Sequence, residues 1–351
     1  MCVLGLSGGD FNFVLSGALA RNRRVLREQY CVYTCQGQYL NSMFKFVTHR
    51  FLRCLSVGGV FLVAAVHAED LVIMQAPTDA QDRLQDYTYA VVLRALRETE
   101  GDYGRFRLRE TAHAMVRDRQ FSALHKGKDL TVLTSPPKRQ WSKKVIRVPF
   151  PIQRGISSYR IFMLMEEHKE LLKNVHTLAQ LKAVSTGSSS DWSTTQILAD
   201  HGFNLVVGYG YATMFDMLAQ GRFQTFNRGV NEIPIELEIF SRKHKQLAYD
   251  RYVAVYTYLP NYFYVSPQHK RLAHRIEAGL IKMHKNGALD ELFTAYYGNL
   301  VNGFDLKNRR IFYIENTNLE PGMYAQDKQY LLGFQQKPEV VLESRPAKRQ
   351  E

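Results

Sequence analysis

The stretch that decides the fold is residues 183–226, AVSTGSSSDWSTTQILADHGFNLVVGYGYATMFDMLAQGRFQTF. Its short apolar runs predict strands at 183–184, 205–207 and 223–226, and the patterns between them predict helices at 194–199 and 214–218. Strands that alternate with helices are typical of an α/β protein. We therefore expect a sheet covered by helices in this part of the chain.

The same alternation continues toward both ends of the chain. Strands are predicted at 71–74, 105–110 and 130–133, and helices at 87–96 and 115–124, which gives a β-α-β-α-β unit. Further strands are predicted at 145–152, 159–165, 252–258, 262–265 and 311–314, and helices at 272–284 and 289–296. The chain is therefore expected to contain two α/β units.

The second unit lies between two extended segments, 159–165 and 251–258. If the chain crosses between lobes at both segments, lobe 2 is inserted into lobe 1. We predict lobe 1 at 69–160 plus 251–320, lobe 2 at 161–250 and a C-terminal tail at 321–351. Two crossings make a hinge, and they leave a cleft at the carboxyl ends of the strands, where α/β proteins usually bind ligands.

Composition narrows the class of protein. The 351 residues include 45% apolar residues, which is enough for a large core and excludes a disordered or collagen-like chain. The formal net charge of +13 raises the encounter rate with any anion and selects none. Zinc-finger spacing, basic-zipper heptads and an RNA-binding signature are all missing from the sequence, so no nucleic-acid partner is expected.

Residues 43–68 have the pattern of a secretion signal. Lys45, Arg50 and Arg53 form a positive segment, and the apolar run at 55–66 is shorter than the ~20 residues that span a membrane. Cleavage is expected after Ala68, which predicts a periplasmic protein. Because a signal works from the start of a chain, Met43 is the expected initiator and residues 1–42 an over-extended reading frame. All four cysteines precede Ala68, so the exported chain has no disulfide.

The residues resemble those of the type II periplasmic solute-binding proteins, in particular the family 3, amino-acid-type group. The resemblance is carried by the signal, the opening strand at 71–75, LAQLK at 178–182 followed by TGSSSD at 186–191, and MLAQGRF at 217–223. It implies a two-lobed fold, each lobe a mixed sheet flanked by helices with two hinge crossovers, that captures a small solute and performs no chemistry.

The resemblance also implies where a ligand is held. A loop of lobe 1 is expected to offer Arg139 to a ligand carboxylate, with Lys138 or Lys144 as substitutes. The loop and helix start after the first strand of lobe 2 imply a second set of ligand-binding residues: Thr186, Gly187, Ser188, Ser189 and Asp191. Gly187 permits a tight turn, and the N–H groups of a helix start attract an anion. The alternative is that Ser190 or Asp191 only caps the helix.

The third family position contains Arg228, where amino-acid binders often place an aspartate against the ligand ammonium group. An arginine repels an ammonium group and favours a carboxylate or phosphate. Glu232 and Glu236 are close enough in sequence to restore a negative contact, so Glu232 is included in the expected site. The alternative for Arg228 is an exposed or structurally paired arginine.

We therefore expect an exported, monomeric protein that binds a small polar or anionic solute for a membrane permease of an ABC transporter, without a cofactor. One alternative is a ligand-sensing protein for a membrane receptor. Another is a dehydratase-type enzyme with Glu232 as its acid or base. No metal is expected, since His269 and His274 are five residues apart and do not share a helix face as zinc ligands do.

Overall fold

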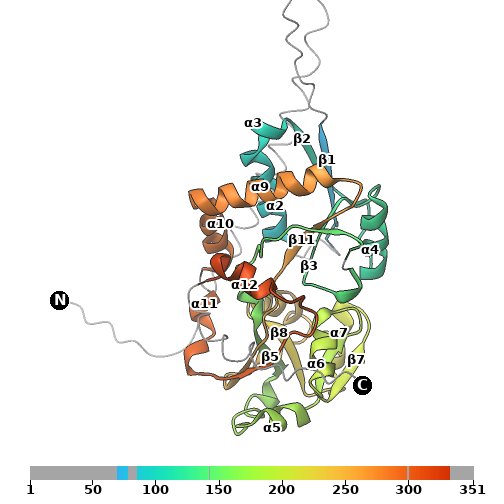
Figure 1. Ribbon diagram of the computed structural model, residues 1–351. Coiled ribbons are helices and arrows are strands. Elements are labelled where there is room, and N and C mark those ends of the chain that lie inside the picture. Colours follow the sequence, from blue (N-terminus) through green and yellow to red (C-terminus); the bar gives the residue numbers. More distant parts are fainter. Residues whose placement is uncertain (1–68, 78–84, 142, 299, 333–351) are drawn as a thin grey trace, which may run out of the picture. The chain divides into compact units, whose positions relative to one another are not determined.

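The computed structural model describes residues 69–77, 85–141, 143–298 and 300–332 (Figure 1). The predicted start, signal segment and cleavage after Ala68 lie outside the described residues, as does the end of the predicted tail. Among the helices that are described, none is both long and apolar enough to cross a membrane.

A first group of strands comes from the two ends of the described chain. β1 (Asp70–Met74) pairs in parallel with β2 (Phe106–Glu110), and β11 (Tyr262–Val265) lies antiparallel between β3 (Val132–Ser135) and β4 (Ile146–Arg147). These two small sheets adjoin, because the backbone N–H of Thr131 donates to the carbonyl of Ile73 at 3.0 Å.

Among the described helices, five accompany the first group: α2 (Asp86–Glu98), α3 (Glu100–Tyr103), α4 (Arg117–Lys126), α9 (Lys270–Asn286) and α10 (Ala288–Tyr297). The short helix α11 (Leu300–Gly303) comes after α10 in the chain. α2 and α9 pack closely, since a Cβ atom at Gly279 would lie 2.3 Å from the carbonyl oxygen of Ala95. The apolar core under α4 includes Leu124, Leu133, Trp141 and Tyr264.

The second group is one seven-stranded sheet. Its order is β12 (Arg310–Tyr313), β10 (Val253–Tyr256), β5 (Tyr159–Met165), β8 (Thr225–Gly229), β6 (Thr186–Ser189) and β7 (Leu205–Gly208), with β9 (Leu247–Tyr249) also paired to β5. β6 runs parallel to β7 and β8, whereas β5 is antiparallel to β8, β9 and β10. The accompanying helices are α5 (Leu178–Ala183), α6 (Ser193–Asp200), α7 (Tyr211–Ala219) and α8 (Ile233–Phe240).

The predicted α/β class, with mixed sheets flanked by helices, is confirmed, but some element positions are wrong. Residues 183–184 are not a strand, because α5, which a Thr177–Gln180 capping box begins, extends to Ala183. The strand is instead Thr186–Ser189, which contains no strongly apolar residue and yet is buried throughout. β4 contains two residues of the predicted 145–152 strand, since Pro149 and Pro151 interrupt it. α8 was not predicted.

The chain passes from the first group to the second between β4 and β5 and returns between β10 and β11. It then visits the second group again at β12, and α12 (Met323–Asp327) buries Met323 in the first group's core. Strand pairing thus assigns residues 253–256 and 310–313 to the larger sheet, whereas the predicted division put them in lobe 1. The predicted tail at 321–351 begins with packed structure. The lobe boundaries themselves stay a prediction.

Candidate functional site

A cavity of about 540 Å³ is lined by residues of both strand groups. Its lining includes residues that lie one or two positions after parallel strands: Gln75 after β1, Asp191 after β6, Gly210 after β7 and Asn231 after β8. The carboxyl ends of parallel strands are where open α/β sheets bind ligands. The volume suits a small molecule.

Five described helices of at least eight residues begin at residues that line this cavity, namely α2 after Gln85, α8 after Glu232, and α4, α6 and α7. α4 begins after Val116, α6 after Trp192 and α7 after Gly210, and all three of these residues line the cavity. No side-chain hydrogen bond caps the starts of α4, α6 and α7 within the described residues. Each start therefore presents backbone N–H donors and the positive end of a helix dipole, which together favour an anion.

The charged side chains of the cavity wall are unbalanced. Four cationic side chains line it, namely Arg117, Lys138, Arg160 and Arg228, against two acidic ones, Asp191 and Glu232, within the described residues. The lining alone thus has a formal charge of +2. These residues form two clusters, one around Glu232 and one around Asp191.

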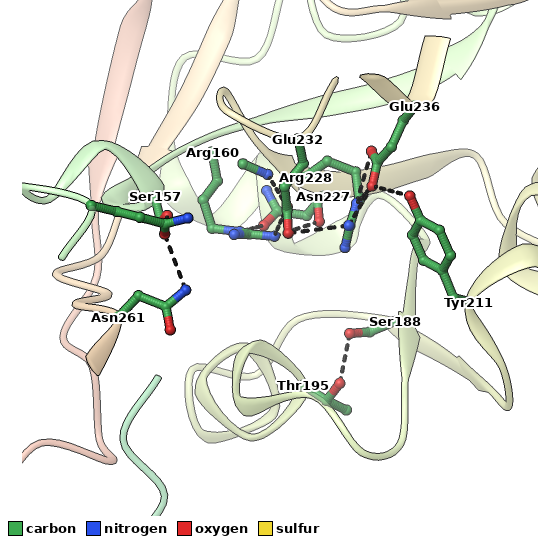
Figure 2. Close-up of polar contacts among 12 residues, drawn as sticks. Ser157, Arg160, Ser188, Thr195, Tyr211, Asn227, Arg228, Glu232, Glu236 and Asn261 are labelled. Carbon is green, nitrogen blue, oxygen red and sulfur yellow. Dashed lines mark hydrogen bonds and ion pairs between the residues drawn. The ribbon is translucent and has the colours of Figure 1, made fainter. Parts of the chain in front are cut away.

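The first cluster joins β5, β8 and the start of α8 (Figure 2). Arg160 is buried, and its Nε donates to Asn227 Oδ1 at 2.8 Å while Nη2 lies 3.5 Å from Glu232 Oε2. The backbone N–H of Gly229 donates to the same Glu232 oxygen at 2.6 Å. Burial opposes the ionisation of Glu232, but the guanidinium groups of Arg228 and Arg160 outweigh it and hold the pKa of this carboxyl below 4.5.

Arg228 occupies the centre of this cluster. Its Nε donates to both carboxylate oxygens of the buried Glu236, at 2.8 and 3.0 Å, and its Nη2 lies 3.2 Å from Glu232 Oε1. Its guanidinium carbon lies 4.4 Å from the ring centroid of Trp192, within cation–π range. Burial alone would lower the pKa of Arg228, but Glu232 and Glu236 raise it, so this arginine stays charged. Figure 2 also shows the Tyr211 hydroxyl, which donates to Glu236 at 3.0 Å.

The second cluster joins the first group of strands to the segment after β6. Arg117, half-buried at the start of α4, donates from Nη1 to Gln120 Oε1 at 3.0 Å and to the carbonyl of Thr134 at 3.4 Å. Lys138 donates to the backbone carbonyl of Asp191, and Asp191 Oδ1 accepts a hydrogen bond from Ser189 Oγ at 2.7 Å. Burial lowers the pKa of Lys138, and Asp191 partly opposes this effect.

Several buried polar atoms of lining residues have no hydrogen-bond partner among the described residues: Gln75 Oε1, Thr134 Oγ1, Ser193 Oγ, Asn231 Oδ1 and Asn261 Oδ1. An unpaired buried polar atom costs roughly 1–3 kcal/mol, so most such atoms in native proteins are paired. Their concentration around one cavity indicates a place where a bound molecule or water supplies the partners.

Most of the residues predicted in TGSSSD do not line the cavity. The expectation of a loop and helix start here was wrong, because Thr186, Gly187, Ser188 and Ser189 form the buried strand β6. Thr186 Oγ1 lies 2.9 Å from Thr225 Oγ1, and Ser188 Oγ 2.6 Å from Thr195 Oγ1, as Figure 2 shows for the latter pair. Gly187 is needed for close packing rather than a turn, since a Cβ atom would lie 2.3 Å from the Phe223 ring.

The other predicted residues divide. Asp191, Arg228 and Glu232 line the cavity. Arg139 is exposed in a short 3-10 turn (Arg139–Trp141) and does not line it. Lys138, the substitute considered for Arg139, lines the cavity. Asp191 and Ser190 do not cap α6, whose N-cap is Trp192. The alternative for Arg228, structural pairing, describes its contacts with Glu236.

Sequence reasoning missed Arg117 and Arg160. Arg160 carried a usable signal, because it is the one charged residue in the apolar strand YRIFMLM at 159–165, and a buried charge needs a partner. Arg117 carried none, since an arginine in the first turn of a polar helix is ordinarily a solvated side chain. No group of three or more His, Cys, Asp or Glu side chains in the described part of the chain could hold a metal ion.

Comparison with family models finds no match. Comparison with curated proteins likewise finds none. Solved structures do match, and they are of the kind that the sequence resembles. A histidine kinase sensor domain with similarity to periplasmic binding proteins is 18% identical over 66% of this chain and 97% of its own length, with a TM-score of 0.47.

Two other matching structures are binding proteins. An arginine-specific periplasmic binding protein of Salmonella typhimurium is 14% identical over 65% of this chain and 99% of its own, with a TM-score of 0.48. An amino acid ABC transporter substrate-binding protein from Streptococcus pneumoniae, bound to L-arginine, is 13% identical over 66% and 93%, with a TM-score of 0.46. At these TM-scores the likeness tells nothing of what this chain binds.

Proposed function

We propose that this chain is an extracytoplasmic solute-binding protein that captures a small polar or anionic solute in the cavity between its two strand groups. The single observation that carries the proposal is the convergence of the uncapped starts of α4, α6 and α7 and an excess of cationic side chains on that cavity. Fixed N–H donors and cations placed around a small cavity complement an anion.

Binding without chemistry is supported by the state of the acidic residues. A dehydratase needs a carboxyl or histidine that exchanges a proton near neutral pH. Glu232, the predicted acid or base, is instead held ionised by Arg228 and Arg160, because they lower its pKa. Histidine is missing from the described lining of the cavity. We therefore favour a binding protein over an enzyme on this scaffold.

The proposal includes export through the segment 43–68, with cleavage after Ala68, and a periplasmic location. A membrane permease is the proposed partner, to which the loaded protein delivers its solute. A sensory role for a membrane receptor uses the same binding event and differs only in the partner. The two roles are separated by measuring uptake of the bound solute in cells with and without this chain.

The proposal is tested by thermal-shift screening of the purified full chain against a broad panel of amino acids, organic acids, sugars and inorganic anions, followed by titration calorimetry of each hit. We expect at least one anionic solute to raise the melting temperature in a saturable way, since a ligand that binds only the folded state stabilises it. A cooperatively folded protein that responds to no member of the panel contradicts the proposal.

A further inference from the structure

We infer that the ligand carries an oxyanion, a carboxylate or a phosphate, and no ammonium group, so that organic acids are preferred over amino acids. This inference rests on the proposed function and specifies its ligand. It follows from how the charged groups of the cavity wall are already used, as the two clusters show.

Glu232 is not free to receive a ligand ammonium group. It accepts the backbone N–H of Gly229 at 2.6 Å and lies 3.5 Å from Arg160 Nη2 and 3.2 Å from Arg228 Nη2. A carboxylate offers about four lone-pair sites, so little capacity remains. An ammonium group that approached Glu232 would also approach two guanidinium groups. Together with Glu236, which pairs with Arg228, the cluster holds two carboxylates and two guanidinium groups, so Glu232 offers an approaching ammonium group no net negative charge.

Asp191 is in a similar position. Its Oδ1 accepts from Ser189 Oγ, and Lys138 donates to its own backbone carbonyl. The charge of Asp191 acts on both Arg117 and Lys138. Like Glu232, it therefore faces two cations from the protein itself. Neither Asp191 nor Glu232 therefore gives its part of the cavity wall a net negative charge.

The unused groups of the wall are donors. Arg117 uses only Nη1, which leaves Nε and Nη2 without partners in the described part of the chain. Arg228 bonds through Nε and Nη2, and Arg160 does the same, so each leaves Nη1. The uncapped starts of α4, α6 and α7 add backbone N–H groups. Donors in excess, together with a lining charge of +2, match an oxyanion with no positive group of its own.

Arg117 and Arg228 have different parts in this arrangement. Arg228 is fixed by Glu236 and the Trp192 ring, and Glu236 balances its charge, so it offers the ligand only the N–H groups of Nη1. Arg117 binds only neutral oxygens of Gln120 and Thr134, which makes its guanidinium the one with no carboxylate hydrogen bond among the described cavity arginines. Arg117 is therefore the residue assigned to the ligand oxyanion.

The test measures dissociation constants of the full chain for pairs of solutes that differ only by an α-ammonium group: propionate and L-alanine, succinate and L-aspartate, glutarate and L-glutamate. Inorganic phosphate is a separate arm for the other oxyanion source. We expect the acid of at least one pair, or phosphate, to bind at least tenfold tighter than every amino acid tested. An amino acid that binds tenfold tighter than its partner acid overturns this inference and leaves the proposed function standing. If these solutes and the broad panel all fail, both fall.

Two variants sharpen the test. Glu232→Gln removes a negative charge from the cavity wall, so we expect oxyanion affinity to rise a few-fold; an affinity that is unchanged or lower contradicts the inference. Arg117→Gln is expected to weaken oxyanion binding at least tenfold. Arg97→Gln, at an exposed position in the last turn of α2 and outside the cavity lining, is the matched control.

Because Glu232 also bonds within the fold, the melting curve of each variant is compared with that of the wild type before titration. Asp191→Asn replaces Glu232→Gln if the latter does not fold.

Discussion

Two arginines, Arg275 in α9 and Arg117 in α4, show how differently the fold uses the same side chain. Arg275 is 0% exposed, and its guanidinium donates to the Asp70 carboxylate at 2.7 Å and to Thr99 Oγ1 at 3.2 Å. It also donates to three backbone carbonyls, those of Leu96, Gly104 and Arg105. Arg117 is half-buried and bonds two amide oxygens through one nitrogen.

The difference separates a structural arginine from a binding one. Every nitrogen of Arg275 has a partner, and its carbonyl partners are at the C-terminal end of α2 and the segment before β2, so it joins α9 to both. Arg117 has donors left over beside a cavity. A saturated guanidinium contributes to folding, while an unsaturated one is available to a ligand.

The largest effect should follow from Arg275→Met. This change leaves Asp70 and several buried carbonyls without their partner, and breaking a buried ion pair costs about 3–5 kcal/mol of unfolding free energy. Urea denaturation should show that loss. Binding by the protein that remains folded should be unchanged, because Arg275 does not line the cavity. If the unfolding free energy falls by less than about 1 kcal/mol, Arg275 contributes no more than an exposed ion pair and is not a structural arginine.

Arg117→Gln should have the opposite profile. We expect the dissociation constant for the oxyanion ligand to rise about 10- to 100-fold, because a hydrogen bond to a charged group contributes about 1.5–3 kcal/mol. The unfolding free energy should change by no more than about 0.5 kcal/mol, as for an ordinary substitution near the surface. Calorimetry and urea denaturation on the same preparation measure both. Unchanged affinity together with a large stability loss would make Arg117 structural.

The buried carboxyl group of Asp327 makes a contribution to stability that depends on pH. Asp327 in α12 accepts a hydrogen bond from Tyr258 at 2.6 Å and another from Tyr262, and burial raises its pKa above 3.8 despite both bonds. Since the folded state binds this proton more tightly than the unfolded state, the contribution of Asp327 to stability is present below pH 3.8 and lost as pH rises through the raised pKa.

Asp327→Asn should therefore make the unfolding free energy fall less as pH rises through the raised pKa of Asp327. The variant should lose up to about 1 kcal/mol at low pH, from poorer hydrogen bonding to the two tyrosines, and less at neutral pH. Melting curves from pH 4 to pH 7 test this. A gap between variant and wild type that widens as pH rises would show that Asp327 is stabilised as a carboxylate.

The smallest effect should come from an exposed pair. Arg94 Nε lies 2.8 Å from Glu98 Oε1 one turn along α2, with the Arg94 side chain 48% exposed. Such pairs contribute about 0.3–0.5 kcal/mol and are screened by salt. Arg94→Ala should lower the unfolding free energy by that amount at low salt and by less at high salt. A loss as large as that of Arg275→Met would mean that the number of hydrogen-bonded guanidinium nitrogens does not determine how much Arg94 and Arg275 contribute to stability.

The sequence predicted the strands that are continuous apolar runs and missed the buried strand that is not. Val253 to Val255 and Tyr262 to Val265 are continuous apolar runs, and both are strands as expected. Thr186–Ser189 carries no such signal; it is buried because β7 and β8 flank it, which is a property of the sheet and not of the segment. Tertiary context decides strands of this kind.

Two of the predicted site residues line the cavity because they lie shortly after strands. Asp191 and Glu232 come shortly after β6 and β8, so their place at the strand ends could be expected from topology. Of the two neighbouring cations considered for the lobe 1 loop, Lys138 lines the cavity, whereas Arg139 is exposed in a short turn. The pairing of Arg228 with Glu236 depended on α8, which the sequence did not predict.

Native mass spectrometry of the protein purified from its source tests the central claim most directly, by weighing what the cavity holds. We predict a non-covalent solute of small mass that carries a carboxylate or phosphate and no amine, present on the wild type and on Arg97→Gln but depleted from Arg117→Gln. A bound amino acid, or a solute retained equally by all three proteins, would contradict the assignment of Arg117 and its cavity.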